Sequence, residues 1–244
     1  MAGRDRQLLS NSTQQFAMLP GHQLPGPEMQ LDVDGFTLVP MLLSEAECND
    51  VAQALSLAES RGVGSRRLLE EDWCADLAHK VMIHAEIRRY LPADVRAVQC
   101  TFFEKSAEKN WLVPIHQDLS IPVARRVSHP ALSGWSEKEG AVFVQPPDTV
   151  LRQLLAVRVH IDRCSEEDGP LRLVPASHEL GRVDPGRAAI LGRTQGFVVP
   201  AERGDALVMR PLVLHASSKS SGTSRRRVLH FLFGPEALPF DLAW

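Results

Sequence analysis

The sequence predicts a mainly β fold in which two N-terminal helices pack against an antiparallel barrel or sandwich. Helical patterns are confined to the part of the chain before about Tyr90, whereas short apolar stretches separated by turn residues follow from Asp94 to Phe233. The chain has 244 residues, enough to bury a substantial core in one domain. Neither an internal repeat nor an interdomain linker interrupts this order.

The N-terminal region divides into an arm and the start of the domain. Residues 1–28 are rich in Gln, Ser, Pro and Gly and lack periodicity, so we expect a flexible arm. A single domain is expected over residues 29–244. Its first element is a short strand at Phe36–Val39, which Pro40 ends.

Two helices should follow this strand. Ser44 and Glu47 have the spacing of a capping box, which predicts a helix that continues to about Ser60. A second helix is predicted over residues 72–90. Its apolar residues would face the core: Leu77, Val81, Ile83 and Ile87.

The rest of the chain has the composition of short strands with turns between them. Apolar and β-branched residues are enriched in seven stretches, which we predict to be strands. They are residues 95–104, 112–118, 154–162, 171–174, 196–199, 206–215 and 228–233.

Composition and charge exclude several classes of partner. The net charge of −3 and a pI near 6.3 lack the basic signature of a nucleic-acid-binding protein. The four cysteines are far apart, which disfavours a zinc knuckle or a disulfide scaffold and suits a reducing compartment. Neither a signal peptide nor a membrane-spanning stretch is recognisable. We expect a cytoplasmic monomer or weak homodimer that binds a small-molecule substrate.

A His-Gln-Asp triplet and a later histidine lie at the ends of two expected strands. Alternate side chains of an extended chain share a face, so His116 and Asp118 can reach one metal ion while Gln117 points away. His215 closes the apolar run Leu207–Leu214. A lone histidine there is more often a core residue, so the prediction depends on all three together. Two imidazoles and one carboxylate form the facial ligand set of non-haem Fe(II) oxygenases, which leaves three coordination positions open.

Three consecutive arginines, Arg225–Arg227, lead directly into the expected strand at residues 228–233. Such a run is usually solvated, but strand alternation must turn at least one guanidinium toward the interior. A buried arginine favours a planar anion that it can bind through two hydrogen bonds. The distal carboxylate of 2-oxoglutarate fits this role, since its other end would fill two open iron positions and leave the third for O2.

Four motifs follow one another along the chain: the HQD triplet, GPLRLVPASH at residues 169–178, Gly204-Asp205, and HASS at residues 215–218. In this order they resemble the phytanoyl-CoA dioxygenase family of Fe(II)/2-oxoglutarate-dependent oxygenases. The resemblance covers roughly residues 29–235. It implies a double-stranded β-helix (jelly-roll, cupin-like) core with the N-terminal helices packed on it. It also implies iron held by His116, Asp118 and His215.

The resemblance extends to cosubstrate binding. The family's 2-oxoglutarate-binding arginine follows the distal histidine by eleven positions, which is Arg226, and its helper serine by two, which is Ser217. Arg225 stays an alternative, because the motif does not fix the length of the preceding loop. Where the family often carries tryptophan, this chain has Arg158, which would contact 2-oxoglutarate or an acidic group of the substrate. The intact Asp118 favours hydroxylation, desaturation or cyclisation, since related halogenases replace the carboxylate with a small residue.

Further candidates surround this core of the site. Gln99 would line the cosubstrate pocket, and His160, which shares a strand face with Arg158, would line the pocket or lie against a polar edge. Residues 121–150 contain four prolines and two glycines, which predicts a long irregular insertion that acts as an active-site lid. Within it, His129 and Trp135 would contact substrate, although large aromatic residues more often have packing roles.

The sequence thus predicts a dioxygenase that hydroxylates an aliphatic C–H bond of a small molecule and releases succinate and CO2. Four arginines in and beside the insertion suggest an anionic group on the substrate: Arg125, Arg126, Arg152 and Arg158. One alternative is a cupin-like metal-dependent isomerase or hydrolase, which commonly recruits an extra His or Glu ligand and needs no buried arginine. Another is a non-catalytic binding protein on the same fold, which would tolerate loss of the triad.

Overall fold

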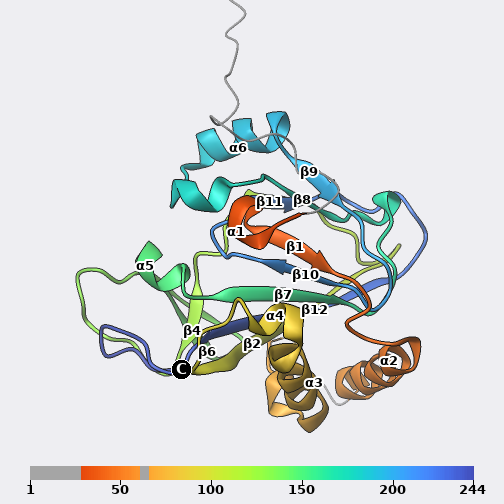
Figure 1. Cartoon of the computed structure of the whole chain (residues 1–244), viewed down its shortest axis with the longest axis horizontal. Coiled ribbons are helices and arrows are strands. Elements are labelled where there is room, and N and C mark those ends of the chain that lie inside the picture. Colours follow the sequence, from red (N-terminus) through yellow and green to blue (C-terminus); the bar gives the residue numbers. More distant parts are fainter. Residues whose placement is uncertain (1–28, 61–65) are drawn as a thin grey trace, which may run out of the picture.

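Two antiparallel sheets form the centre of the molecule in a computed structural model that describes residues 29–60 and 66–244 (Figure 1). The predicted arm at residues 1–28 lies outside the described residues. The larger sheet has five strands, in the order β1 (Phe36–Val39), β10 (Ala206–Met209), β7 (Leu155–His160), β12 (Arg226–Pro235) and β2 (Val95–Lys105). The smaller has four, in the order β3 (Val113–His116), β11 (His215–Ser217), β8 (Leu171–Leu173) and β9 (Phe197–Val199).

Apolar side chains of both sheets belong to one buried cluster, so the sheets pack on one another. The larger sheet contributes Phe36, Leu207 and Met209 to this cluster, and the smaller contributes Leu171 and Leu173. Two antiparallel sheets packed in this way form the jelly-roll core that the sequence predicts.

Helices cover the outer faces of both sheets (Figure 1). α2 (Glu45–Ser60) and α3 (Asp72–Ile83) share a second buried cluster with the five-stranded sheet. The predicted capping box is present, because the backbone N–H of Ser44 donates to Glu47 and that of Glu47 donates to the Ser44 hydroxyl. α6 (Pro185–Thr194), which the sequence analysis missed, packs on the four-stranded sheet. The remaining helices are short: α1 (Leu31–Asp34), α4 (Ala85–Arg88), α5 (Asp148–Leu151) and three 3₁₀ turns at Leu68–Glu70, Glu166–Asp168 and Ser177–Leu180.

The prediction of one helix over residues 72–90 is wrong. His84 is extended, with ψ at 126°, and separates α3 from α4. Side chains of a straight helix rotate by about 100° per residue, so Ile83 and Ile87 cannot share a face with Val81. Ile83 is 57% exposed, whereas the break at His84 turns Ile87 back into the core.

The prediction of one strand over residues 206–215 is also wrong. β10 ends at Met209 in the larger sheet, and β11 begins at His215 in the smaller one. Pro211 lacks the N–H that a ladder requires, and the N–H of Val213 donates to the carbonyl of Arg210 in a turn. The chain therefore crosses between the sheets here, and His215 opens a strand instead of closing one.

The sequence predicts an irregular insertion at residues 121–150, and this prediction is wrong. It forms a third antiparallel sheet in the order β4 (Ile121–Val123), β6 (Ala141–Gln145) and β5 (Ser133–Lys138). Pro122 lies in the edge strand β4, where a missing N–H is tolerated. Its role as a lid stays a prediction. None of the described helices has the length and apolar character to cross a membrane.

Candidate metal centre and its pocket

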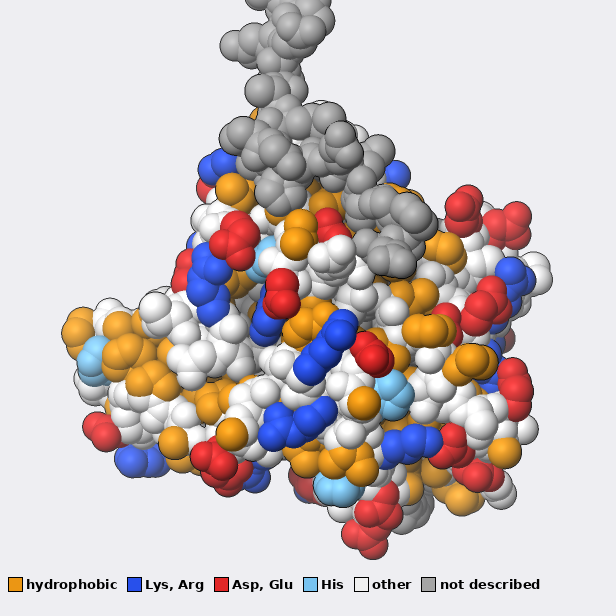
Figure 2. Space-filling model, in the orientation of Figure 1, with side chains coloured by type: hydrophobic (Ala, Val, Ile, Leu, Met, Phe, Trp, Pro, Cys, Tyr) orange, Lys and Arg blue, Asp and Glu red, His pale blue; other side chains and the backbone are white. Residues whose placement is uncertain are grey.

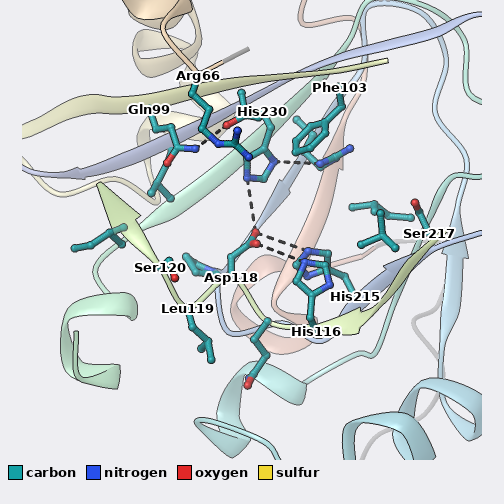
Figure 3. Close-up of a pocket in the computed structure, with 18 of the residues that line it drawn as sticks. Arg66, Gln99, Phe103, His116, Asp118, Leu119, Ser120, His215, Ser217 and His230 are labelled. Carbon is teal, nitrogen blue, oxygen red and sulfur yellow. Dashed lines mark hydrogen bonds and ion pairs between the residues drawn. The ribbon is translucent and has the colours of Figure 1, made fainter. Parts of the chain in front are cut away.

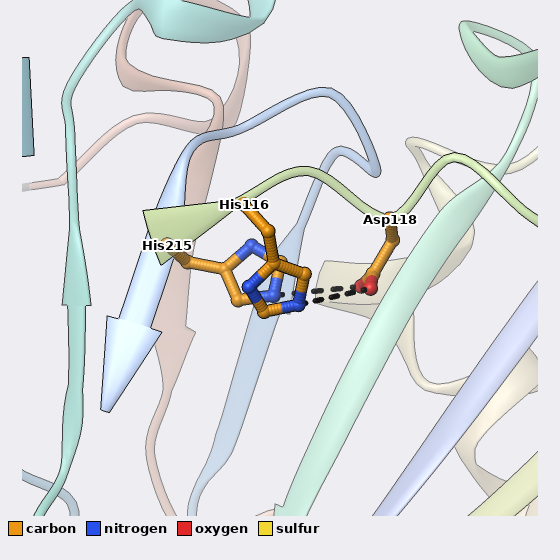
Figure 4. Close-up of side chains that lie close together, drawn as sticks. All are labelled: His116, Asp118 and His215. Atoms are coloured by element: carbon orange, nitrogen blue, oxygen red, sulfur yellow. Dashed lines mark ion pairs between the residues drawn. The ribbon is translucent and has the colours of Figure 1, made fainter. Parts of the chain in front are cut away.

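His116, Asp118 and His215 converge at one point between the two sheets (Figure 4). Nε2 of His116 lies 3.8 Å from Oδ1 of Asp118, and Nε2 of His215 lies 3.7 Å from Oδ2. One ligand atom from each residue lies within 4.8 Å of the others, short enough for a single ion to reach all three. In the described residues this is the one cluster of His, Cys, Asp or Glu with metal-binding spacing.

Strand pairing brings the two histidines together. β3 and β11 are antiparallel neighbours in which His116 lies directly opposite His215, and the ring centroids are 4.2 Å apart. The Nδ1 atoms of both rings lie 2.9 Å from a backbone carbonyl, that of Pro114 for His116 and that of Val213 for His215. A carbonyl can only accept, so each Nδ1 carries the proton and each Nε2 lone pair is free for a metal.

Asp118 lies just beyond the end of β3, and the chain between it and His116 is firmly held. The side-chain amide of the intervening Gln117 donates to the carbonyls of Gly181 and Leu212 and accepts from the N–H of Val183. Gln117 thus points away from the metal centre, as strand alternation predicts, and it fixes the backbone on which both ligands stand.

Protonation at the centre suits a divalent cation. Burial acts to raise the pKa of the Asp118 carboxyl, but the neighbouring imidazoles and Arg158 outweigh it and hold the pKa below its usual value. Burial lowers the pKa of His215 to about 4. At neutral pH the carboxylate is therefore charged and His215 is neutral, which are the forms that bind metal.

The metal centre opens into a pocket of about 410 Å³ (Figure 3). Its wall on the larger sheet consists of alternate residues of β2, β7 and β12, which face away from the helices. These residues are Gln99, Thr101, Phe103, Lys105, Arg158, Arg226, His230 and Leu232.

The pocket has one dominant sign of charge. The described residues that line it include five cations and one carboxylate, that of Asp118; the cations are Arg66, Lys105, Lys138, Arg158 and Arg226. By contrast, acidic and basic side chains are interspersed over the outer face seen in Figure 2. A concave site with this excess of positive charge is suited to anionic ligands.

Arg226 and Arg225 point in opposite directions. Arg226 is 3% exposed and lines the pocket, where one guanidinium nitrogen donates to the carbonyl of Gly169. Its Nε has no hydrogen-bond partner among the described residues. Arg225 instead pairs with Glu104 and Glu59 on the helix side of the sheet. A buried guanidinium with an unused donor is the feature expected of an anion-binding arginine.

Ser217 lies at the same end of the pocket as Arg226, beside a lysine that the sequence analysis missed. Nζ of Lys105 donates to the Ser217 hydroxyl over 2.7 Å and lies opposite Arg226 in the pairing of β2 with β12. Burial and the nearby Arg226 lower the pKa of Lys105 to about 8. Its position at every second residue from Gln99 was the signal that could have identified it.

His230 is the second residue that the sequence analysis missed. Its Nε2 lies 3.7 Å from Oδ2 of Asp118, and its Nδ1 lies 3.3 Å from a terminal nitrogen of Arg158 (Figure 3). Burial and Arg158 lower the pKa of His230 to about 3, so the ring is neutral. His230 lies four residues after Arg226 in the same strand and therefore on the same face, which is the sequence signal that could have identified it as a pocket residue.

The other predicted residues occupy different places. Gln99 lines the pocket and donates to the hydroxyl of Thr101. His160, Trp135 and His129 are not among the described residues that line it. His160 is buried two residues beyond Arg158 in β7. The ring of Trp135 packs against the guanidinium of Arg126, and the ring of His129 contacts that of Phe240. Roles in substrate binding for these three stay predictions.

Comparisons with known proteins agree with this site and fold. The sequence profile of the phytanoyl-CoA dioxygenase (PhyH) family matches residues 31–228. A comparison with curated protein sequences finds no match. Most of the described domain, including all three proposed metal ligands, therefore lies within the matched region.

Several solved structures share the fold at low sequence identity. HygX from Streptomyces hygroscopicus, solved with nickel and 2-oxoglutarate, is 17% identical over 84% of this chain and 84% of that chain, with a TM-score of 0.58. The carbocyclase SnoK from nogalamycin biosynthesis is 16% identical over 84% and 81%, with a TM-score of 0.62. EctD from S. alaskensis is 15% identical over 88% and 79%, with a TM-score of 0.64. These similarities confirm the predicted fold class.

Proposed function

The chain belongs to the phytanoyl-CoA dioxygenase family, and from this premise we propose that it is an Fe(II)/2-oxoglutarate-dependent dioxygenase. It hydroxylates an aliphatic C–H bond of a small-molecule substrate and releases succinate and CO2. One observation carries the proposal: a two-histidine, one-carboxylate cluster opens into a cationic pocket whose deep end holds a buried arginine with an unused donor.

The residues present fit the metal that the proposal requires. His116, Asp118 and His215 would hold Fe(II) on one face, and neutral imidazoles with one carboxylate are the ligand types of that site. When bound, iron would activate O2, which is the oxidant and takes two electrons from 2-oxoglutarate and two from the substrate C–H bond, while the protein supplies binding, orientation and electrostatics.

Three residues would bind the distal carboxylate of 2-oxoglutarate. Arg226 offers its free Nε–H, Ser217 offers a hydroxyl, and Lys105 supplies a second positive charge beside both. The span along β12 from His230, beside the metal centre, to Arg226 is four residues, or about 13 Å of extended chain. The side chains of His230 and Arg226, together with the five-carbon diacid 2-oxoglutarate, can fill the space between these two positions.

The opposite end of the pocket would receive the substrate. Apolar side chains dominate this end, together with the amides of Gln99 and Gln145; the apolar residues are Leu119, Ile121, Phe143, Leu154 and Leu232. Ile121, Phe143 and Gln145 come from the small sheet β4–β6–β5, which supports a role for this insertion as the lid. Arg66 at the rim already pairs with Glu139, whereas the ammonium of Lys138 lies over the ring of Phe143 and favours a substrate with an acidic group.

The same site could support a different outcome of hydrogen abstraction. SnoK, a carbocyclase, and SnoN, an epimerase from the same pathway, share this fold. Cyclisation is therefore the second candidate for this chain. A cupin-like isomerase or hydrolase is disfavoured, because the described residues add no further His or Glu to the three-residue cluster. A non-catalytic binding protein is disfavoured because the triad is intact.

The test begins with spectroscopy. Anaerobic addition of Fe(II) and 2-oxoglutarate to the metal-free protein is expected to produce a weak visible charge-transfer band. A folded, metal-loaded protein without that band would contradict the proposal. Substrate-stimulated release of succinate, measured across acyl-CoA thioesters, amino acids and small natural products, would then identify the substrate class, and its product would distinguish hydroxylation from cyclisation.

A further inference from the structure

Arg158 is a buried cation that lacks an anionic partner in the part of the chain that the structure describes. It is 6% exposed, faces the pocket from β7, and forms no ion pair among the described residues. A guanidinium keeps its charge at any physiological pH and carries five N–H donors. Burying such a group without a partner is costly, so a ligand that brings negative charge is the expected complement.

The hydrogen bonds of Arg158 leave most of its donors free. One terminal nitrogen lies 3.3 Å from Nδ1 of His230, and the guanidinium carbon lies 5.2 Å from the centre of the Phe103 ring. Its Nε has no hydrogen-bond partner within residues 29–60 and 66–244. The side chain therefore has a fixed position, against an aromatic face and an imidazole, with unused donors in the pocket.

The position of Arg158 along the sheet, relative to the metal centre and to Arg226, indicates which anion it binds. In the pairing of β7 with β12, Arg158 lies opposite His230, the residue that contacts Asp118 at the metal centre. Arg226 lies four residues further along β12, at the deep end. The two arginines thus stand at the two levels at which the two carboxylates of 2-oxoglutarate would lie.

His230 links Arg158 to the metal centre. An arginine can only donate, so Nδ1 of His230 accepts and the ring proton lies on Nε2. That proton points toward Oδ2 of Asp118, 3.7 Å away. His230 is in this way a positioning residue, which holds the guanidinium at the height of the metal.

We propose that Arg158 binds the carboxylate next to the keto group of 2-oxoglutarate, so that each carboxylate of the cosubstrate has its own arginine. This inference rests on the proposed function. The alternative source of the same chemistry is a carboxylate or phosphate of the substrate. Arg158 lies over the ring of Phe103. Phe103 is on the side of the pocket toward Ser217 and away from Gln99 (Figure 3), which favours the cosubstrate.

Two 2-oxo acids separate the roles of the arginines. 2-Oxobutyrate keeps the 2-oxo acid end of 2-oxoglutarate and lacks the distal carboxylate. Dissociation constants of both acids would be measured anaerobically by calorimetry with the Ni(II)-loaded protein. Arg158→Gln is expected to weaken both acids by a similar factor, roughly 30-fold or more. Arg226→Gln is expected to weaken 2-oxoglutarate alone and to leave 2-oxobutyrate within twofold of wild type.

Controls keep the outcomes separate. Arg163→Gln removes an exposed arginine three residues after the end of β7 and is expected to change neither affinity. Arg158→Lys retains the charge and guards against misfolding of the Gln variant; it is expected to bind 2-oxobutyrate more weakly than wild type, because one ammonium replaces the planar fork.

The inference is overturned if the Arg158 variants bind 2-oxobutyrate as wild type does. A loss confined to 2-oxoglutarate would assign Arg158 to the distal carboxylate, and a loss confined to substrate affinity would assign it to the substrate. Wild-type protein that binds neither acid in the presence of metal would contradict the proposed function itself, irrespective of Arg158.

Discussion

The two faces of the five-stranded sheet differ in what they bury. Toward the helices, β7 and β12 present mainly apolar side chains: Leu155, Val157, Val159, Leu229, Phe231 and Phe233. Arg227, near the start of β12, shares the parity of these residues and pairs with Asp162. On the opposite side, the same strands carry buried charged and polar side chains: Arg158, Arg226 and His230, which line the pocket, and His160, which lies beyond it. The alternation of a β-strand allows one segment to serve both purposes. Stability should therefore depend on the first face, and ligand binding on the second.

The largest effect should follow from loss of the Asp118 carboxylate, which lies opposite the polar side of the five-stranded sheet. Changes to groups that merely support a metal ligand cost 10–100-fold in affinity or activity, so Asp118→Ala should reduce succinate formation by more than about 100-fold. Because the Asp118 side chain is 35% exposed, the free energy of unfolding of the metal-free protein should change by less than about 1 kcal/mol.

Succinate release and urea unfolding measure the two effects of this change. Asp50→Ala, on the exposed side of α2, is the matched control and should alter neither quantity. Turnover that survives in Asp118→Ala would remove this carboxylate from the metal centre, and a large loss of stability would break the division of labour between the faces.

The helix-facing side should show the reverse. Phe231 is fully buried between the sheet and the helices, so Phe231→Ala should cost about 3–5 kcal/mol of unfolding free energy. The protein that remains folded should bind Ni(II) with unchanged affinity. Ile83→Ala serves as the control, because Ile83 is exposed at the end of α3, and it should cost less than about 1 kcal/mol. Equal losses for the two variants would mean that the helix does not end as described.

Acid should destabilise the protein through His160, a buried histidine on the polar side of the five-stranded sheet. Burial beside Arg158 and Arg226 lowers the pKa of His160 to about 3, whereas an unfolded imidazole titrates near pH 6.5. Between these values the unfolded chain binds a proton that the folded protein does not, so stability falls as pH falls from about 6.5 toward 3. The slope for one such group is at most about 1.4 kcal/mol per pH unit.

His160→Gln should therefore reduce the loss of stability between pH 6.5 and 5 by up to about 2 kcal/mol. Urea unfolding of the metal-free protein at intervals across this range provides the measurement. His79→Gln, an exposed histidine of α3, should retain the wild-type slope. Parallel pH profiles for His160→Gln and wild type would show that His160 is not held neutral in the fold.

The same division explains which features the sequence could predict. His116, Asp118 and His215 belong to motifs with local spacing, and Arg226 follows from its distance to His215, so their convergence was predictable. Lys105 and His230 were missed because their roles depend on pairing between β2, β7 and β12, which are far apart in the chain.

Breaks within elements were harder to predict than the elements themselves. Residues 206–215 are apolar enough for one strand, yet the chain changes sheets at Pro211. Residues 72–90 contain enough apolar positions for one helix, yet the core demands a turn at His84 to bury Ile87. In both cases packing between distant segments overrides the local pattern.

The smallest expected effect is that of replacing Arg225, which faces the helix side of the sheet, whereas the adjacent Arg226 faces the pocket. Arg225 pairs with Glu104 and Glu59 on the helix side, and its side chain is 45% exposed, so Arg225→Ala should cost at most about 1 kcal/mol of stability. Affinity for 2-oxoglutarate, measured by calorimetry with the Ni(II)-loaded protein, should stay within twofold of wild type. Arg226→Ala is the matched change on the pocket side and should weaken that affinity strongly, because it leaves a carboxylate buried without its partner. If Arg225→Ala causes the greater loss instead, the register that assigns Arg226 to the pocket is wrong by one residue.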